Sequence, residues 1–157
     1  MKSNLDMKNT TLCYIEQDGA YLMMHRVKKE NDINREKWVG IGGKFESGET
    51  PTECAVREIK EETGVTPKNL RYRGLVTFVS KEYGTEYMHL FTASGYDGKI
   101  NYDCKEGELV WVKKSEIETL NIWQGDKIFF KLLDSEKSFF SLKLVYAGDK
   151  LIDYKVE

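Results

Sequence analysis

The segment from Gly43 to Val65, GKFESGETPTECAVREIKEETGV, constrains the fold of this chain more than any other. Thr50 is followed by a proline and, three positions on, by Glu53, so the two side chains can cap the start of a helix reciprocally. Gly64 predicts the end of the helix, because glycine accepts the left-handed conformation that closes many helices. The pattern therefore predicts a helix over residues 51–63.

Three carboxylates share one face of this predicted helix. Glu58, Glu61 and Glu62 stand at positions i, i+3 and i+4, which are neighbours on a helix surface. Apolar residues lie on the flank beside them, namely Ala55, Val56 and Ile59. Like charges at these spacings repel by a few tenths of a kcal/mol each, roughly. A bound divalent cation would reverse that repulsion, which favours a metal site over a solvated acidic surface.

The residues before the helix fit such a site. Gly40, Gly42 and Gly43 let the backbone approach a ligand and expose its amides and carbonyls, and Lys44 adds a positive charge. Oxygen ligands of this kind suit Mg²⁺, which proteins usually hold together with substrate phosphates. We therefore expect Mg²⁺ as the cofactor, with Mn²⁺ as an alternative.

The Gly43 to Val65 segment resembles the signature of the Nudix hydrolases, G-x5-E-x7-R-E-U-x-E-E-x-G-U, where U is a bulky aliphatic residue, at every specified position. The resemblance implies an α/β fold, the Nudix fold, with a mixed β-sheet sandwiched between helices (α/β/α). It also implies hydrolysis of a phosphoric anhydride bond, with metal ions orienting a water for attack on phosphorus.

Carried over by position, the resemblance assigns metal ligands and catalytic residues. The metal ligands would be the Gly42 carbonyl and the carboxylates of Glu58, Glu61, Glu62 and, from a later loop, Glu106. The catalytic set would be Arg57, Glu58, Glu61 and Glu62, with Arg57 orienting a carboxylate and the general base left open among the glutamates. Glu108 competes with Glu106, and a solvated loop acid is the alternative role for Glu106. Glu49 would connect residues 40–44, the glycine segment, to the helix.

Outside this signature the chain looks like the MutT-type oxidised purine nucleoside triphosphatases, the 8-oxo-dGTP diphosphatase branch. The similar segments are residues 38–44, 123–126 and 151–154. The resemblance implies cleavage of a nucleoside triphosphate to its monophosphate and pyrophosphate. Val39 and Gly125 depart from the asparagine and aspartate common in that branch, so we expect a modest preference for oxidised bases.

The substrate-binding residues implied by position are Thr11, Arg26, Val39, Gly43, Lys44, Phe78, Trp123 and Asp126. For the aromatic residues the alternative is a role in the core, because large aromatic side chains are mostly packing residues. For Asp126 the alternative is a cap or favourable charge at the start of a second helix.

Length, charge and cysteine content limit the number of domains, the partners and the cellular compartment that we expect. A chain of 157 residues suits one domain, which we place at residues 10–157 after a flexible segment at 1–9. A net charge of -2 argues against binding long nucleic acids, and no apolar run is long enough for a membrane span. Three cysteines without a CxxC motif suit a reduced, cytoplasmic protein. The expected partner is a small nucleotide, and we expect a monomer, with a homodimer as the alternative.

Alternating patterns and turn residues predict the other elements. We expect a polar loop at 28–37, a second helix at 126–133, a hairpin turn at Asp18-Gly19 and another at Gly148-Asp149. The expected strands are 10–15, 20–26, 72–80, 87–94, 109–113, 139–146 and 150–156.

Three classes of function fit the sequence. The first is a Mg²⁺-dependent pyrophosphohydrolase of purine nucleoside triphosphates. The second is a Nudix hydrolase with another diphosphate substrate, such as ADP-ribose, a dinucleoside polyphosphate or a capped 5′ end. The third is a non-catalytic nucleotide-sensing domain, or an isomerase on the same fold, which the complete set of carboxylates disfavours.

Overall fold

The computed structural model describes residues 7–135 and 138–157. Within these residues an eight-stranded mixed sheet has the order β10-β9-β5-β6-β1-β2-β3, with β8 also paired to β2. A second sheet pairs the short strands β4 and β7. The strands are β1 (Met7–Gln17), β2 (Ala20–His25), β3 (Trp38–Val39), β4 (Thr66–Pro67), β5 (Arg71–Ser80), β6 (Gly84–Ser94), β7 (Tyr96–Asp97), β8 (Glu108–Lys113), β9 (Phe140–Ala147) and β10 (Lys150–Val156).

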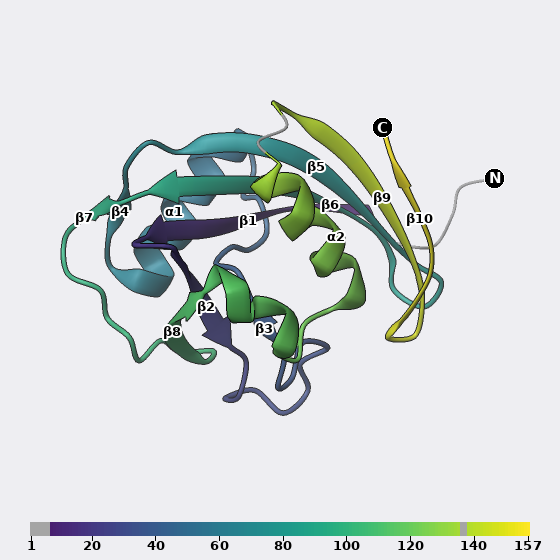
Figure 1. The fold of residues 1–157 in the computed structure, drawn as a ribbon, viewed down its shortest axis with the longest axis horizontal. Helices are drawn as coiled ribbons and strands as arrows, with labels where there is room; N and C mark the ends of the chain where they lie inside the picture. Colours follow the sequence, from purple (N-terminus) through teal and green to yellow (C-terminus); the bar gives the residue numbers. More distant parts are fainter. Residues whose placement is uncertain (1–6, 136–137) are drawn as a thin grey trace.

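Two helices cover opposite faces of the large sheet, as Figure 1 shows for α1 (Pro51–Thr63) and α2 (Gln124–Asp134). Alternate residues of β1 supply the two cores, since neighbouring side chains on a strand point to opposite faces. Tyr14 packs in the core beneath α2, whereas Cys13 packs in the core beneath α1. A 3-10 helix, η1 (Lys114–Thr119), joins β8 to α2. The expected α/β/α arrangement is confirmed.

The sheet opens between β1 and β2. β1 pairs with β6 in parallel along residues 7–16, but it pairs with β2 only next to the hairpin turn, at Glu16 and Gln17. Beyond this point the glycine segment takes the place of β2 at the edge of β1, with bridges from Cys13 to Ile41 and from Thr10 to Lys44. This divergence places the glycine segment beside α1 and leaves a cleft between the two halves of the sheet.

Helix α1 begins and ends where the sequence predicts. Thr50 accepts a hydrogen bond from the Glu53 amide, the Glu53 side chain accepts one from the Thr50 amide, and Gly64 closes the helix at a φ of 84°. Cys54, Ala55 and Ile59 form its buried face, so Cys54 takes the place we expected for Val56, which is exposed.

Most strand predictions are confirmed with shifted ends, but the chain start is corrected. Residues 7–9, which we placed in a flexible segment, belong to β1, where they pair with residues 85–87 of β6; residues 1–6 of that segment lie outside the described residues. Asp18 and Gly19 both have positive φ, as the hairpin prediction requires. The strands β3, β4 and β7 were missed, because two-residue strands leave no periodic pattern in the sequence.

No helix in residues 7–135 and 138–157 combines the length and the apolar character that crossing a membrane requires.

The capping box of α1 predicts a stability effect. We expect Thr50→Ala to lower the free energy of unfolding by about 1 kcal/mol, because the Glu53 amide loses its partner. Thr52→Ala, at an exposed position in the first turn of the same helix, is the matched control and should cost little. Urea denaturation measures both variants, and equal losses would show that the cap contributes nothing specific.

Candidate functional site

One cleft of about 860 Å³ is lined by all the residues of the predicted catalytic, metal-binding and substrate-binding sets. It runs from the acidic face of α1, past the glycine segment, to an aromatic end at the start of α2. The predicted residues that line it are Thr11, Arg26, Val39, Gly42, Gly43, Lys44, Arg57, Glu58, Glu61, Glu62, Phe78, Glu106, Trp123 and Asp126. Glu108, the competitor of Glu106, lies in β8 and does not line the cleft.

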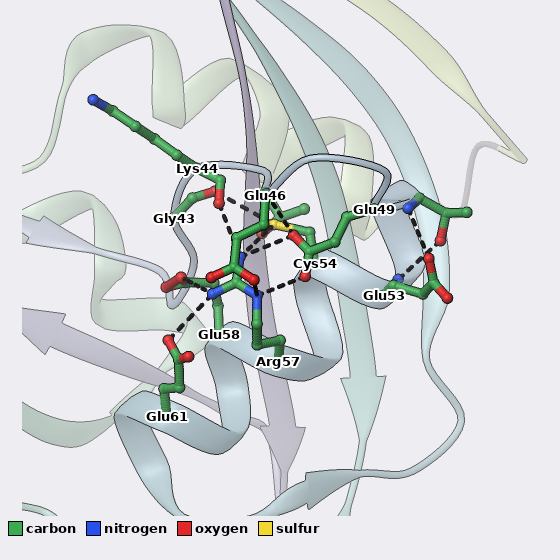
Figure 2. Close-up of polar contacts among 11 residues, drawn as sticks. Gly43, Lys44, Glu46, Glu49, Glu53, Cys54, Arg57, Glu58 and Glu61 are labelled. Atoms are coloured by element: carbon green, nitrogen blue, oxygen red, sulfur yellow. Dashed lines mark hydrogen bonds and ion pairs between the residues drawn. The ribbon is translucent and has the colours of Figure 1, made fainter.

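Arg57 is the centre of the polar contacts on α1, as Figure 2 shows. Its guanidinium donates to both carboxylate oxygens of Glu49, at 2.6 and 2.9 Å, and to the Lys44 carbonyl at 2.9 Å. It also donates to Glu58 at 2.7 Å and to Glu61 at 3.2 Å. These bonds join the glycine segment, the turn before α1 and the acidic face of the helix into one rigid unit.

The two hydrogen bonds from Arg57 to Glu49 change the pKa of this carboxyl group. Hydrogen bonding from Arg57 lowers the pKa of Glu49 to about 2, with help from the Glu46 amide. The same contact raises the pKa of Arg57. Both groups therefore stay charged, and Glu49 serves to hold Arg57 and the preceding turn in place.

The other carboxylates crowd one another. Burial, together with the nearby charges of Glu58 and Glu106, raises the pKa of Glu62 to about 8. Burial likewise raises the pKa of Glu58, although Arg57 opposes this, and Glu61 and Glu106 add to it. The charged forms of Glu58 and Glu62 are therefore disfavoured, as expected where a cation would stabilise the ionised carboxylates.

The glycines at 42 and 43 have little room for a side chain. A Cβ on Gly42 would overlap the Thr11 carbonyl, and a Cβ on Gly43 would overlap the Glu58 carboxylate. The Gly43 carbonyl accepts a bond from the Thr11 amide at 2.9 Å, while the Gly42 amide donates to Glu62 at 3.2 Å. The backbone therefore touches β1 on one side and the acidic face of α1 on the other.

Basic residues hold Glu106 at the opposite wall. Arg26 Nη1 lies 3.0 Å from Glu106, Lys29 Nζ lies 3.6 Å from it, and Arg26 Nε donates to Asp32 at 2.7 Å. Glu58 and Glu61 are hydrogen-bonded to Arg57, and Glu106 is hydrogen-bonded to Arg26. In this arrangement no three described His, Cys, Asp or Glu side chains are grouped closely enough to hold a metal ion. Chelation would therefore require some of these carboxylates to exchange an arginine for the cation.

The aromatic end combines large rings with one buried acid. Trp123 meets Phe78 and Tyr146 edge to face, with ring centroids 5.7 and 5.2 Å apart. Asp126 is 6% exposed, and no side chain caps the start of α2, so its alternative role as a helix cap is wrong, although it lies in the first turn, where the other alternative, a favourable charge, places it. Burial raises the pKa of Asp126 to about 8, while Lys37 acts in the opposite direction.

Sequence reasoning missed the part of the site contributed by residues 28–37. Trp123 Nε1 donates to Asn34 at 2.7 Å, and Lys37 Nζ lies 4.7 Å from the centre of a Trp123 ring. The Asp32 carboxylate accepts hydrogen bonds from both the Arg26 side chain and the backbone N–H of Asn34. The sequence marks this segment only as a polar loop, and no spacing or motif within it indicates which side chains face the cleft.

Comparison with known proteins adds to this geometry. The NUDIX domain family matches residues 7–133. The chain is 31% identical to the uncharacterized Nudix hydrolase YvcI of Bacillus subtilis (strain 168), across 96% of this chain and 95% of that protein. It is 30% identical to the oxidized purine nucleoside triphosphate hydrolase of Danio rerio, across 96% of this chain and 94% of that protein. The crystal structure of mMutator MutT protein from Bacillus halodurans matches with a TM-score of 0.84 and 28% identity, covering 96% of this chain and 97% of that one.

The buried acid at the aromatic end predicts a pH-dependent stability. The pKa of Asp126 is about 8 in the folded protein, against an ordinary value of 3.8. Its contribution to stability is therefore complete below the unfolded pKa and is lost as the pH rises toward 8. We expect the Tm of Asp126→Asn to exceed that of the unmodified protein by a margin that grows between about pH 5 and pH 8.

Asp134→Asn is the control for this series, because Asp134 is an exposed acid at the end of the same helix. Its Tm margin should not grow with pH. A margin for Asp126→Asn that stays constant across the range would show that the buried carboxyl ionises normally.

Proposed function

Because this chain belongs to the Nudix hydrolases, we propose that it is a divalent-cation-dependent pyrophosphohydrolase that converts a purine nucleoside triphosphate to its monophosphate and pyrophosphate. One observation carries the proposal. The acidic face of α1 and the aromatic end with Asp126 are parts of a single cleft, so one nucleotide can place its phosphates at the first and its base at the second.

The donor set fits Mg²⁺ or Mn²⁺. Every candidate ligand is a hard oxygen atom, and burial among neighbouring carboxylates raises the pKa of Glu58 and Glu62, which disfavours their ionisation without a cation. Glu58, Glu62 and Glu106, with Glu61 and the Gly42 carbonyl, would hold the ion. When bound, it would neutralise phosphate oxygens and lower the pKa of the attacking water.

The residues of the chain itself position the reactants. Arg57 holds Glu58 and Glu61 at defined places, and Glu49 holds Arg57. One carboxylate among Glu58, Glu61 and Glu62 accepts the proton of the attacking water. Arg26 and Lys44 line the same cleft and supply positive charge for the phosphates.

The base would bind at the aromatic end. Trp123 and Phe78 provide apolar surface for a purine, and Asp126 provides a polar group at its edge. The raised pKa of Asp126 leaves much of this carboxyl protonated near neutral pH, so it can donate as well as accept. The name of the Danio rerio relative supports an oxidised purine as substrate.

A phosphate-release screen tests the proposal. We would compare 8-oxo-dGTP, 2-hydroxy-dATP, dGTP and ADP-ribose and identify the products of each. Pyrophosphate released from a purine triphosphate supports the proposal, and turnover of ADP-ribose alone overturns it. Since Val39 cannot hydrogen-bond to a base through its side chain, we expect kcat/KM for 8-oxo-dGTP to exceed that for dGTP by less than ~10³-fold.

We also propose that the protein works in the cytoplasm as a monomer. Cys13, Cys54 and Cys104 are all free and buried in the structure, which suits a reducing compartment.

The assignment of the acidic face predicts a loss of turnover. We expect Glu61→Gln and Glu62→Gln each to lower kcat in Mg²⁺ by at least ~10²-fold, because each removes a charged metal ligand. Both should also reduce the rise in Tm that Mg²⁺ produces in the unmodified protein.

Glu53→Gln is the matched control, because it makes the same change on the same helix at an exposed position outside the cleft. Glutamine still completes a capping box, so both turnover and the response to Mg²⁺ should be preserved. Near-normal turnover in Glu61→Gln or Glu62→Gln would remove that residue from the proposed ligand set.

A further inference from the structure

A second polar side chain reaches the aromatic end of the cleft from the loop between β2 and β3. Asn34 lines the cleft together with Trp123 and Asp126. Its Oδ1 accepts a hydrogen bond from Trp123 Nε1 at 2.7 Å, although the two residues are 89 positions apart in the chain. Asn34 is therefore part of the wall on which we place the base.

This hydrogen bond determines which way the Asn34 amide faces. An indole N–H can only donate, so the atom of the amide that meets it must be the oxygen and not the nitrogen. The –NH₂ group of Asn34 consequently points away from Trp123. Within residues 7–135 and 138–157, no acceptor is hydrogen-bonded to that group.

The backbone around Asn34 is also held in place. The backbone N–H of Asn34 donates to the Asp32 side chain at 3.0 Å. Asp32 also accepts from Arg26 at 2.7 Å, and only 6% of its side chain is exposed. Lys37 contacts both the Trp123 ring and, at 3.4 Å, the Asn121 side chain. Asn34 therefore lies on a loop whose backbone and neighbouring side chains are held by hydrogen bonds and ion pairs.

Two unsatisfied N–H donors in a ligand-sized cleft select for an acceptor. A nucleobase that carries a carbonyl oxygen on its edge supplies one, whereas an exocyclic amino group places a donor against a donor. Val39 and Phe78, which line the same cleft, have side chains that offer no hydrogen bond. The chemistry of Asn34 therefore distinguishes oxo-bearing from amino-bearing bases.

We propose that Asn34 is a specificity-determining residue, whose amide N–H groups donate to a carbonyl oxygen on the base and favour 6-oxopurine over 6-aminopurine nucleoside triphosphates. The inference rests on the proposed function and specifies the substrate class of the same site. Asp126 can adapt to either base, because a carboxyl that is partly protonated near neutral pH donates or accepts. Asn34 lacks that freedom, since its acceptor atom is turned toward Trp123 and the nitrogen on the other side of the amide can only donate.

The test compares kcat/KM for dGTP and dATP in two variants. Asn34→Asp keeps an oxygen for Trp123 and loses both donors, and Asn34→Ala loses the donors without adding a charge. We expect the dGTP to dATP ratio to fall by about 10-fold or more in both variants, because the carbonyl of the base loses its partner. Each ratio is measured on one preparation, so any inactive fraction cancels.

Asn121→Asp is the matched control. Asn121 contacts the same loop, donating to the Glu36 carbonyl at 3.2 Å and accepting from Lys37, but it does not line the cleft. Its ratio should remain that of the unmodified protein. An equal fall in Asn121→Asp, or a fall in Asn34→Asp without one in Asn34→Ala, would overturn the inference in favour of loop placement or added charge.

The inference and the proposed function fail in different ways. If the unmodified protein cleaves no purine triphosphate in the substrate screen, the proposed function is wrong. If it cleaves them and both Asn34 variants keep the original dGTP to dATP ratio, the function stands and the role of Asn34 is wrong.

Discussion

The contacts of the Arg57 guanidinium are the interaction on which the site depends. One side chain binds Glu49 through two nitrogens and also reaches the Lys44 carbonyl, Glu58 and Glu61. Only arginine offers so many donors in a fixed planar arrangement. The consequence is that a flexible glycine segment and a charged helix behave as one rigid body. Without this group Glu49, Glu58 and Glu61 would lose the cation that offsets their mutual repulsion.

The divergence of β1 from β2 opens the sheet beside the unit formed by the glycine segment and α1, and this unit lines the cleft. β1 is held along its length by β6 but leaves β2 just after the hairpin, and the glycine segment pairs with the exposed edge instead. Close packing explains why this segment is glycine at Gly42 and Gly43, where a side chain would overlap Thr11 or Glu58. At Gly42 the segment therefore meets the backbone of β1 at a distance that no other residue type permits.

Electrostatics divides the cleft into two chemically different halves. At the α1 end, burial and mutual repulsion raise the pKa values of Glu58 and Glu62, so that half is suited to a cation. At the other end a single buried acid, Asp126, lies among aromatic rings, where desolvation alone raises its pKa to about 8. The loop at 28–37 is close to both halves, because Arg26 and Lys29 pair with Glu106 while Asn34 binds Trp123.

Local sequence determined the helix at 51–63, its caps and the alignment of Glu58, Glu61 and Glu62 on one face, because these features depend on residues within one or two turns of each other. It also indicated the hairpin at Asp18-Gly19, since type I′ turns need residues that tolerate positive φ. Only the tertiary structure decided that Arg26 meets Glu106 across 80 residues and that Asn34 meets Trp123 across 89. The pairing of β2 with β8 brings Arg26 near Glu106, and the course of the 28–37 loop brings Asn34 to Trp123. Such contacts follow from how distant segments pack and leave no period or motif in the sequence.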